Sequence, residues 1–293
     1  MLKLFLLLIS CTTDVSIMKT NQPDPGESGL IDDTDTSVVD TDDTDTDAPA
    51  DLTKIVGFAG THFRQIACPA CVGEPGEFDI TAELKLHHPT TGDYLEHLTP
   101  VGTCTTDLYT THVGSQPLSS TQPASFNNIQ LQPTNQGSWA NNYIYEYEYV
   151  RNTQHSITSE HGSISAAFET VEGFDSINPY TLLWVDPSYA FEAVVSKSGT
   201  TFTWSPARPD LQFEIIVAVY SPDGSQFLGA VSCMEQDVGS MSIPGSYFGS
   251  YPYWSLAAVH FIRHNINEVT STDLGGRVQT HMQWEVVGTG HVE

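Results

Sequence analysis

The chain has 293 residues, 36 of them acidic and 10 basic, which gives a formal net charge of −26 at pH 7. A charge of that sign repels phosphate groups, so it argues against nucleic acids and anionic lipid headgroups as partners. The sequence contains no P-loop, no G-x-S-x-G motif and no H-E-x-x-H motif, and these patterns indicate nucleotide, serine or zinc hydrolysis. We therefore expect a protein that is not an enzyme and needs no cofactor.

Residues 1–10 predict a targeting segment, with Lys3 ahead of a short apolar run that is too short for the roughly 20 residues of a membrane-spanning helix. The tetrapeptide Leu8-Ile9-Ser10-Cys11 resembles the lipobox of bacterial lipoproteins. That resemblance implies cleavage before Cys11, diacylglycerol on its thiol and a membrane as a partner through this anchor. Thr12, where an inner-membrane protein would usually carry Asp, favours the outer membrane. An ordinary secretory signal peptide is the alternative.

Residues 11–51 predict a disordered linker. The stretch DDTDTSVVDTDDTDTDAPAD (32–51) is rich in aspartate and has neither lysine nor arginine, so it cannot bury enough apolar surface to fold. A calcium loop is one alternative, but the stretch lacks the required Gly and Glu; a glycosylated Thr-rich stalk is another. As an extended linker it would hold the following domain away from the membrane.

Residues 52–293 predict an all-β fold made of β-sandwiches. Apolar and polar residues alternate in four segments: 78–88, 141–150, 163–171 and 202–206. The segment 211–233 predicts a hairpin that turns at Asp223-Gly224, and 253–264 with 277–286 predict a second hairpin around STDLGG. We place a domain boundary at residue 197, with a β-rich domain at 52–197 and an immunoglobulin-like sandwich at 198–293, because the latter holds enough strands for one such domain.

Two resemblances concern the C-terminal part. FTWSPARPD (202–210) resembles the second strand of fibronectin type III domains, where a core Trp precedes a Pro-rich turn. From end to end the chain resembles surface lipoproteins of predatory and myxobacterial lineages, through its lipobox, its Asp/Thr-rich spacer and the series Trp204, Cys233, EQDVGSMSIP (235–244) and Arg263. These resemblances imply a fold and a location, and no particular activity.

Four cysteines besides Cys11 are available for disulfides: Cys68, Cys71, Cys104 and Cys233. An even number in an exported chain predicts two disulfides, whose pairing spacing alone does not fix. We expect Cys68 or Cys71 to pair with Cys104. The CPAC pair could instead form a redox site or part of a zinc site, but a loop sequence follows it and no second close pair is present.

Three histidines predict the best metal site in the sequence. His260 and His264 share one face of a strand, and His281 would lie between them if the hairpin turns near Ser271. Three imidazoles on one face could bind zinc or copper. We favour a solvated polar face instead, because a register shift of one residue would move a side chain to the other face.

The segment NNYIYEYEYV places four tyrosines on one side of a strand: Tyr143, Tyr145, Tyr147 and Tyr149. Such a row is either the core side of the strand or a platform on which a sugar ring stacks, and the large buried area of aromatic rings favours the core. Glu146 and Glu148 alternate with the tyrosines, at a spacing that an inverting glycosidase could use.

These patterns together predict a lipid-anchored cell-envelope protein, on the outer membrane and exposed at the cell surface. We expect it to display a non-catalytic β-sandwich for adhesion, recognition or structural binding, with a glycan or a protein as ligand. The alternative is a secreted glycosidase-like hydrolase or a metal-binding envelope protein.

Overall fold

The computed structural model describes residues 52–66, 78–90, 99–106, 117–118, 121–127, 129–134, 138–142, 144–145, 154–169, 171, 173–178 and 193–293. These residues are nearly all β, as the alternating sequence predicts. None of the described residues forms a helix with the length and apolar character needed to cross a membrane. The predicted lipidation site Cys11 and the predicted linker lie outside the described residues.

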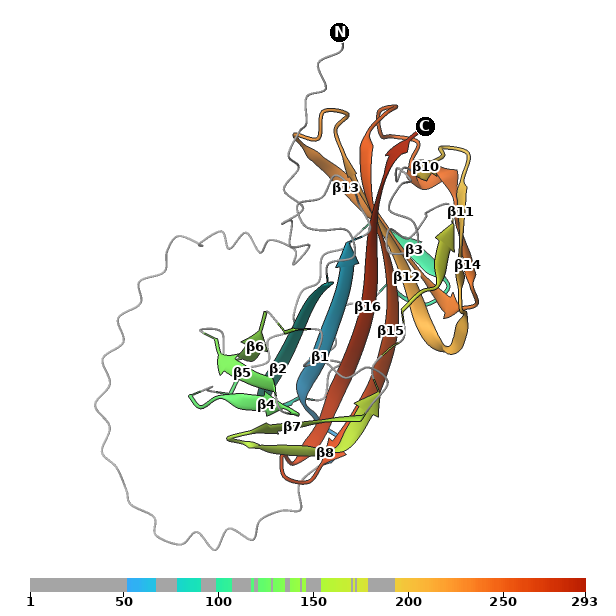
Figure 1. The fold of residues 1–293 in the computed structure, drawn as a ribbon. Coiled ribbons are helices and arrows are strands. Elements are labelled where there is room, and N and C mark those ends of the chain that lie inside the picture. The colour runs from blue at the N-terminus through green and yellow to red at the C-terminus, as the bar shows by residue number, and fades with distance from the viewer. Residues whose placement is uncertain are drawn as a thin grey trace, which may run out of the picture.

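The strands are β1 (Ile55–Ile66), β2 (Phe78–Thr90), β3 (Thr103–Thr105), β4 (Ala124–Phe126), β5 (Ile129–Pro133), β6 (Ser138–Asn141), β7 (Gln154–Ser159), β8 (Gly162–Glu169), β9 (Ser176–Asn178), β10 (Ala193–Val195), β11 (Thr200–Ser205), β12 (Arg208–Tyr220), β13 (Phe227–Asp237), β14 (Ser240–Ile243), β15 (Leu256–Ser271) and β16 (Gly276–Val292), with one 3-10 turn at Gly245–Tyr247. They form a large sheet in the order β3-β13-β12-β15-β16-β1-β2-β6-β5-β4-β7-β8, with β10 beside β16, and a small sheet in the order β14-β11-β9. Figure 1 shows β1, β15 and β16 running side by side through the middle of the molecule, with β11 and β14 to one side.

Both predicted hairpins are confirmed. β12 and β13 pair antiparallel around a turn in which Gly224 has a φ of 72°, a left-handed conformation that glycine adopts without steric cost. β15 and β16 pair antiparallel along their whole length, and Gly275 with a φ of 69° lies in their turn. The predicted strands at 78–88, 163–171 and 202–206 correspond to β2, β8 and β11, whereas most of 141–150 lies outside the described residues.

Strand pairing crosses the predicted boundary at residue 197. β1 pairs in parallel with β16, so that Phe63 lies opposite Trp284, and β3 pairs antiparallel with β13. The strands after residue 197 are also divided, since β11 and β14 join β9 in the small sheet while the others join the large one. The described strands therefore do not form a separate sandwich at 198–293, because strands from both sides of the boundary complete both sheets.

The disulfide joins Cys104 to Cys233, with the two Sγ atoms 1.97 Å apart. Our expectation that Cys104 pairs with Cys68 or Cys71 is wrong. β3 and β13 place Cys104 directly opposite Cys233, and directly opposed residues in an antiparallel pair point to the same face. The other two cysteines lie outside the described residues.

The hydrophobic core between the two sheets contains a buried ion pair. Trp204 stacks on Phe213, with ring centroids 3.6 Å apart, and its Nε1 donates to Asp237 Oδ1 at 2.6 Å. Arg263 Nε donates to the other oxygen of Asp237 at 2.6 Å, and both partners of this pair are fully buried. Trp204 and Arg263 thus both donate to the carboxylate of Asp237, which lies in the segment 235–244. All three belong to the positions on which the lipoprotein resemblance rests.

The first testable consequence concerns this ion pair. Replacing Asp237 by Ala leaves the Arg263 guanidinium buried without its charge partner, so we expect the free energy of unfolding to fall by about 3–5 kcal/mol. Urea denaturation followed by tryptophan fluorescence measures this loss. Asp210→Ala is the matched control, because its pair with Arg208 is exposed and should be worth about 0–1 kcal/mol. Equal effects of the two substitutions would contradict the role of the buried pair.

Candidate functional site

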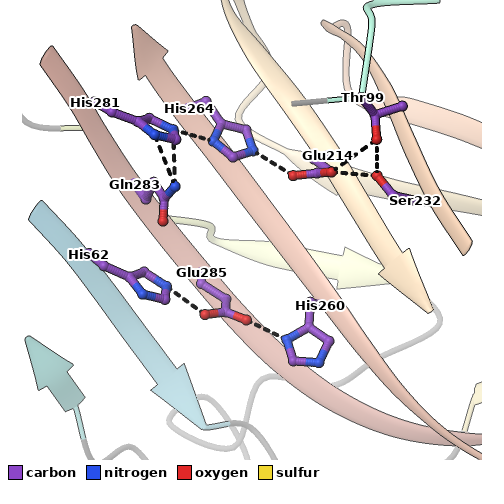
Figure 2. Close-up of polar contacts among 9 residues, drawn as sticks. All are labelled: His62, Thr99, Glu214, Ser232, His260, His264, His281, Gln283 and Glu285. Carbon is purple, nitrogen blue, oxygen red and sulfur yellow. Dashed lines mark hydrogen bonds and ion pairs between the residues drawn. The ribbon is translucent and has the colours of Figure 1, made fainter. Parts of the chain in front are cut away.

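A group of buried and partly buried polar side chains crosses the large sheet on the face opposite that core, and we call it the polar belt (Figure 2). Its members are His62, Thr99, Glu214, Ser232, His260, His264, His281, Gln283 and Glu285. The register brings them together, because β15 places His264 opposite Gln283 of β16 and β1 places His62 opposite the same residue. Opposed residues, and residues two apart on one strand, share a face of the sheet.

One half of the belt is built around Glu214. The Ser232 and Thr99 hydroxyls both donate to Glu214 Oε1, and they also contact each other. The second carboxylate oxygen accepts from His264 Nε2 at 3.1 Å. Burial alone would raise the pKa of Glu214, but the hydrogen bond and charge of His264, together with the two hydroxyls, lower that pKa below its ordinary value. Glu214 is therefore an ionised carboxylate that orients the His264 ring.

His264 in turn contacts a second imidazole. Its Nδ1 lies 2.7 Å from His281 Nε2, and the Gln283 side-chain amide lies 3.0 Å from that same His281 nitrogen. Burial, followed by the charges of His264 and His62, lowers the pKa of His281 well below its ordinary value. His281 is therefore a neutral imidazole at pH 7, and the close contact requires one proton between the two facing ring nitrogens.

The other half of the belt is built around Glu285, which lies between two histidines. Its Oε2 lies 2.5 Å from His62 Nε2, and its Oε1 contacts His260 Nδ1. Burial alone would raise the pKa of Glu285, yet the charges and hydrogen bonds of His62 and His260 lower it well below its ordinary value. The His62 side chain is 33% exposed, whereas that of Glu285 is 5% exposed, so His62 is a solvent-facing end of the belt.

The belt is not arranged for nucleophilic catalysis by serine. Such catalysis needs an imidazole in contact with the hydroxyl and a carboxylate on the far side of the imidazole. Here the Ser232 hydroxyl contacts Thr99 and Glu214, so the carboxylate separates that hydroxyl from His264. The arrangement can instead hold charge, share protons and present imidazole nitrogens to a cation.

The structure brings together two of the three histidines that the sequence nominates for metal binding. His264 and His281 are in contact, whereas His260 is held by Glu285. The register places Ile266, rather than a residue between the two β15 histidines, opposite His281. Among the described residues, no group of three or more His, Cys, Asp or Glu is placed to hold a metal ion.

The preferred alternative of a solvated polar face is wrong, because His260, His264 and His281 are 6%, 1% and 6% exposed. Sequence reasoning missed Glu214 and Glu285. The pattern His281-x-Gln283-x-Glu285 could have indicated part of the belt, since alternate residues of a strand share a face.

The tyrosine row is described only at Tyr145, which is 48% exposed beside an Ile144 that is 3% exposed. The expectation that Tyr145 lies in the core is therefore wrong at this position, because Ile144 takes the buried place. The remaining tyrosines, Tyr143, Tyr147 and Tyr149, lie outside the described residues, as do Glu146 and Glu148.

A second surface feature, which we call the aromatic platform, consists of Tyr253, Trp254 and His291. Tyr253 and Trp254 are 64% and 61% exposed. Trp254 has a φ of 66°, its N–H donates to Val292 O at 2.8 Å, and its ring stacks on His291 with centroids 4.8 Å apart. Lys197 Nζ lies 4.0 Å from the centre of the Tyr253 ring. The platform is thus a pair of large exposed rings fixed by neighbouring contacts.

No protein-family model matches the chain, and no curated protein matches it.

The belt generates a prediction about Glu285. Glu285→Gln removes the charge that its two histidines stabilise, so at pH 7 we expect the free energy of unfolding to fall by about 1–3 kcal/mol. A carboxylate whose folded pKa lies below its ordinary value of 4.5 contributes stability above that value and loses it as the pH falls through the folded pKa. The difference between wild type and variant should therefore shrink below pH 4.5.

Urea unfolding at a series of pH values measures this difference. Exposed Glu235 supplies the control, since Glu235→Gln should change stability by less than about 0.5 kcal/mol. Identical unfolding curves for wild type and Glu285→Gln at pH 7 would show that the two histidines do not stabilise the carboxylate.

Proposed function

We propose that the protein is a lipid-anchored cell-envelope protein that displays a non-catalytic β-sandwich for recognition, with the aromatic platform as its contact surface. The observation that carries this proposal is Trp254, a large exposed ring held in a left-handed backbone conformation. That conformation costs about 1–2 kcal/mol for a residue with a Cβ atom. Strained residues that persist in this way cluster at functional sites.

The chemistry of the platform favours a glycan as the ligand. Flat aromatic rings bury a large area against another apolar surface, and the apolar face of a sugar ring is such a surface. Polar groups surround the rings, since His291 Nε2 lies 3.0 Å from Glu293 Oε1 and Lys197 covers Tyr253. These groups can bond to sugar hydroxyls. The net charge of −26 favours neutral over acidic glycans.

Anchoring rests on the sequence of residues 8–11 and on the aspartate-rich linker that follows. Two acyl chains on Cys11 would suffice for stable membrane attachment, and a solvated linker would let the sandwich extend away from the membrane. The surface of the outer membrane is the location at which a displayed recognition module meets its ligand.

We expect Trp254→Ala to weaken binding to neutral polysaccharides on a glycan array by at least about tenfold, because central aromatic residues contribute most to binding surfaces. Tyr145→Ala is the matched control, since Tyr145 is also an exposed aromatic residue and lies outside the platform. Near-UV circular dichroism checks that each variant is folded. A wild-type protein that binds no glycan, or a Trp254→Ala variant that binds as wild type does, would contradict the proposal.

Anchoring and location have their own test. Wild-type protein should incorporate labelled palmitate and fractionate with the outer membrane, and protease added to intact cells should remove the β domain. Cys11→Ser should abolish both labelling and membrane fractionation, because no other residue of the lipobox can carry the lipid. A β domain that survives protease on intact cells, but not after lysis, would place it in the periplasm and contradict surface display.

A further inference from the structure

We propose that His264 and His281, with the side-chain amide of Gln283, form a binding site for one divalent first-row transition metal ion. Imidazole nitrogens suit Zn(II), Cu(II) and Ni(II). The site lies in the half of the polar belt that contains Glu214 (Figure 2), away from the aromatic platform, so it adds a second kind of ligand and does not depend on the recognition proposal.

The two ring nitrogens that face each other are close to the spacing that a shared metal ion requires. They are 2.7 Å apart and share one proton. Two imidazole nitrogens at about 2.0–2.1 Å from a tetrahedral zinc ion lie about 3.3 Å from each other. Binding requires the two rings to move apart by about 0.6 Å and to turn until both lone pairs point at the metal ion, which then takes the place of that proton.

Gln283 supplies the third protein ligand. Its terminal amide nitrogen lies 3.0 Å from His281 Nε2, the nitrogen that faces His264, and 3.2 Å from His281 Nδ1. Rotation of the amide turns its oxygen to the position of its nitrogen, and only the oxygen can bind a metal ion. Because this ligand is an amide, the site does not contain three His, Cys, Asp or Glu residues.

The surroundings of His264 are those of a metal ligand. Histidines that bind metal ions almost always donate their other ring N–H to a carboxylate or carbonyl, which fixes the ring and leaves one nitrogen for the metal. Glu214 accepts from His264 Nε2 at 3.1 Å, which leaves Nδ1 directed at His281. The Ser232 hydroxyl donates to Glu214 in turn, so the carboxylate is itself held in place.

A metal ion can reach this site from solvent. His62 lies opposite Gln283 on the neighbouring strand, and its side chain is 33% exposed, so the belt opens to solvent beside the amide. The strongly negative net charge of the chain raises the local concentration of cations. His260 takes no part, because its Nδ1 is bound to Glu285.

The test uses the full chain with Cys68 and Cys71 replaced by serine, so that neither cysteine can compete for the metal ion. Calorimetric titration with zinc should show one equivalent bound with a micromolar or lower dissociation constant. With copper(II), electron paramagnetic resonance should show coupling to two imidazole nitrogens. His264→Ala and His281→Ala should each weaken zinc binding by at least about tenfold, and Glu214→Gln by about 10–100-fold.

His260→Ala is the matched control, because His260 lies on the same strand face, is buried and contacts a carboxylate; it should leave zinc affinity unchanged. Gln283→Glu replaces the neutral ligand with a carboxylate and should tighten zinc binding, a gain that an unfolded chain cannot give. Wild-type protein with only millimolar affinity, His281→Ala with wild-type affinity, or equal losses in His260→Ala and His264→Ala would overturn the proposal. Unchanged or weaker binding by Gln283→Glu would exclude Gln283 as a ligand.

Discussion

The parallel pairing of β1 with β16 fixes the arrangement of the large sheet. It joins the first described strand to the last one, so both ends of the β-rich region lie at the centre of the large sheet. β16 also pairs with β15 along its other edge. Central strands have no free edge, and their backbone groups are paired on both sides. Side chains on β16 are therefore held in positions that a loop could not maintain.

The same central strands carry buried ionisable groups on both faces of the sheet, and each face satisfies them differently. Arg263 points into the hydrophobic core, where one carboxylate and two backbone carbonyl groups hold its guanidinium. The next residue, His264, points to the opposite face and joins the polar belt. Burying a charge is costly unless it is paired. The core face meets that cost with a closed ion pair, whereas the belt places imidazoles against its two carboxylates.

Local features of the fold could be predicted from the sequence. The alternation of apolar and polar residues identified β2, β8 and β11, and Asp223-Gly224 identified a turn, because these patterns depend on neighbouring residues. Contacts between distant residues could not be predicted. Cys104 and Cys233 are separated by 129 residues, and their pairing depends on β3 joining the far edge of β13. No spacing rule contains that information.

The polar belt was only partly predictable for a related reason. The shared face of His260 and His264 follows from strand periodicity alone, but the partner of His281 depends on the hairpin register. A shift of the strand register by one residue pair would bring different side chains into contact. Burial of the belt could not be predicted either, because polar residues that alternate with apolar residues along a strand predict a solvated face. Glu214 was missed because it lies on β12, and its contact with His264 requires the pairing of β12 with β15.

β16 connects the two proposed sites through one rigid element. Its middle carries His281 and Gln283, paired there with β1, and its end carries His291, which lies opposite Val194 of β10 and Leu256 of β15. On one edge, β16 is paired with β1 beside His281 and Gln283 and with β10 beside His291. On its other edge it is paired with β15 at both sites. Side chains fixed in this way lose little conformational entropy when a ligand binds, so more of the contact energy remains as affinity. For the proposed metal ion this means that the backbone positions of His281 and Gln283 are fixed before binding, so that only side-chain rotations remain to be made. For a glycan it means that His291 supports Trp254 in one orientation, which favours a ligand with a flat face over one that requires the surface to adapt.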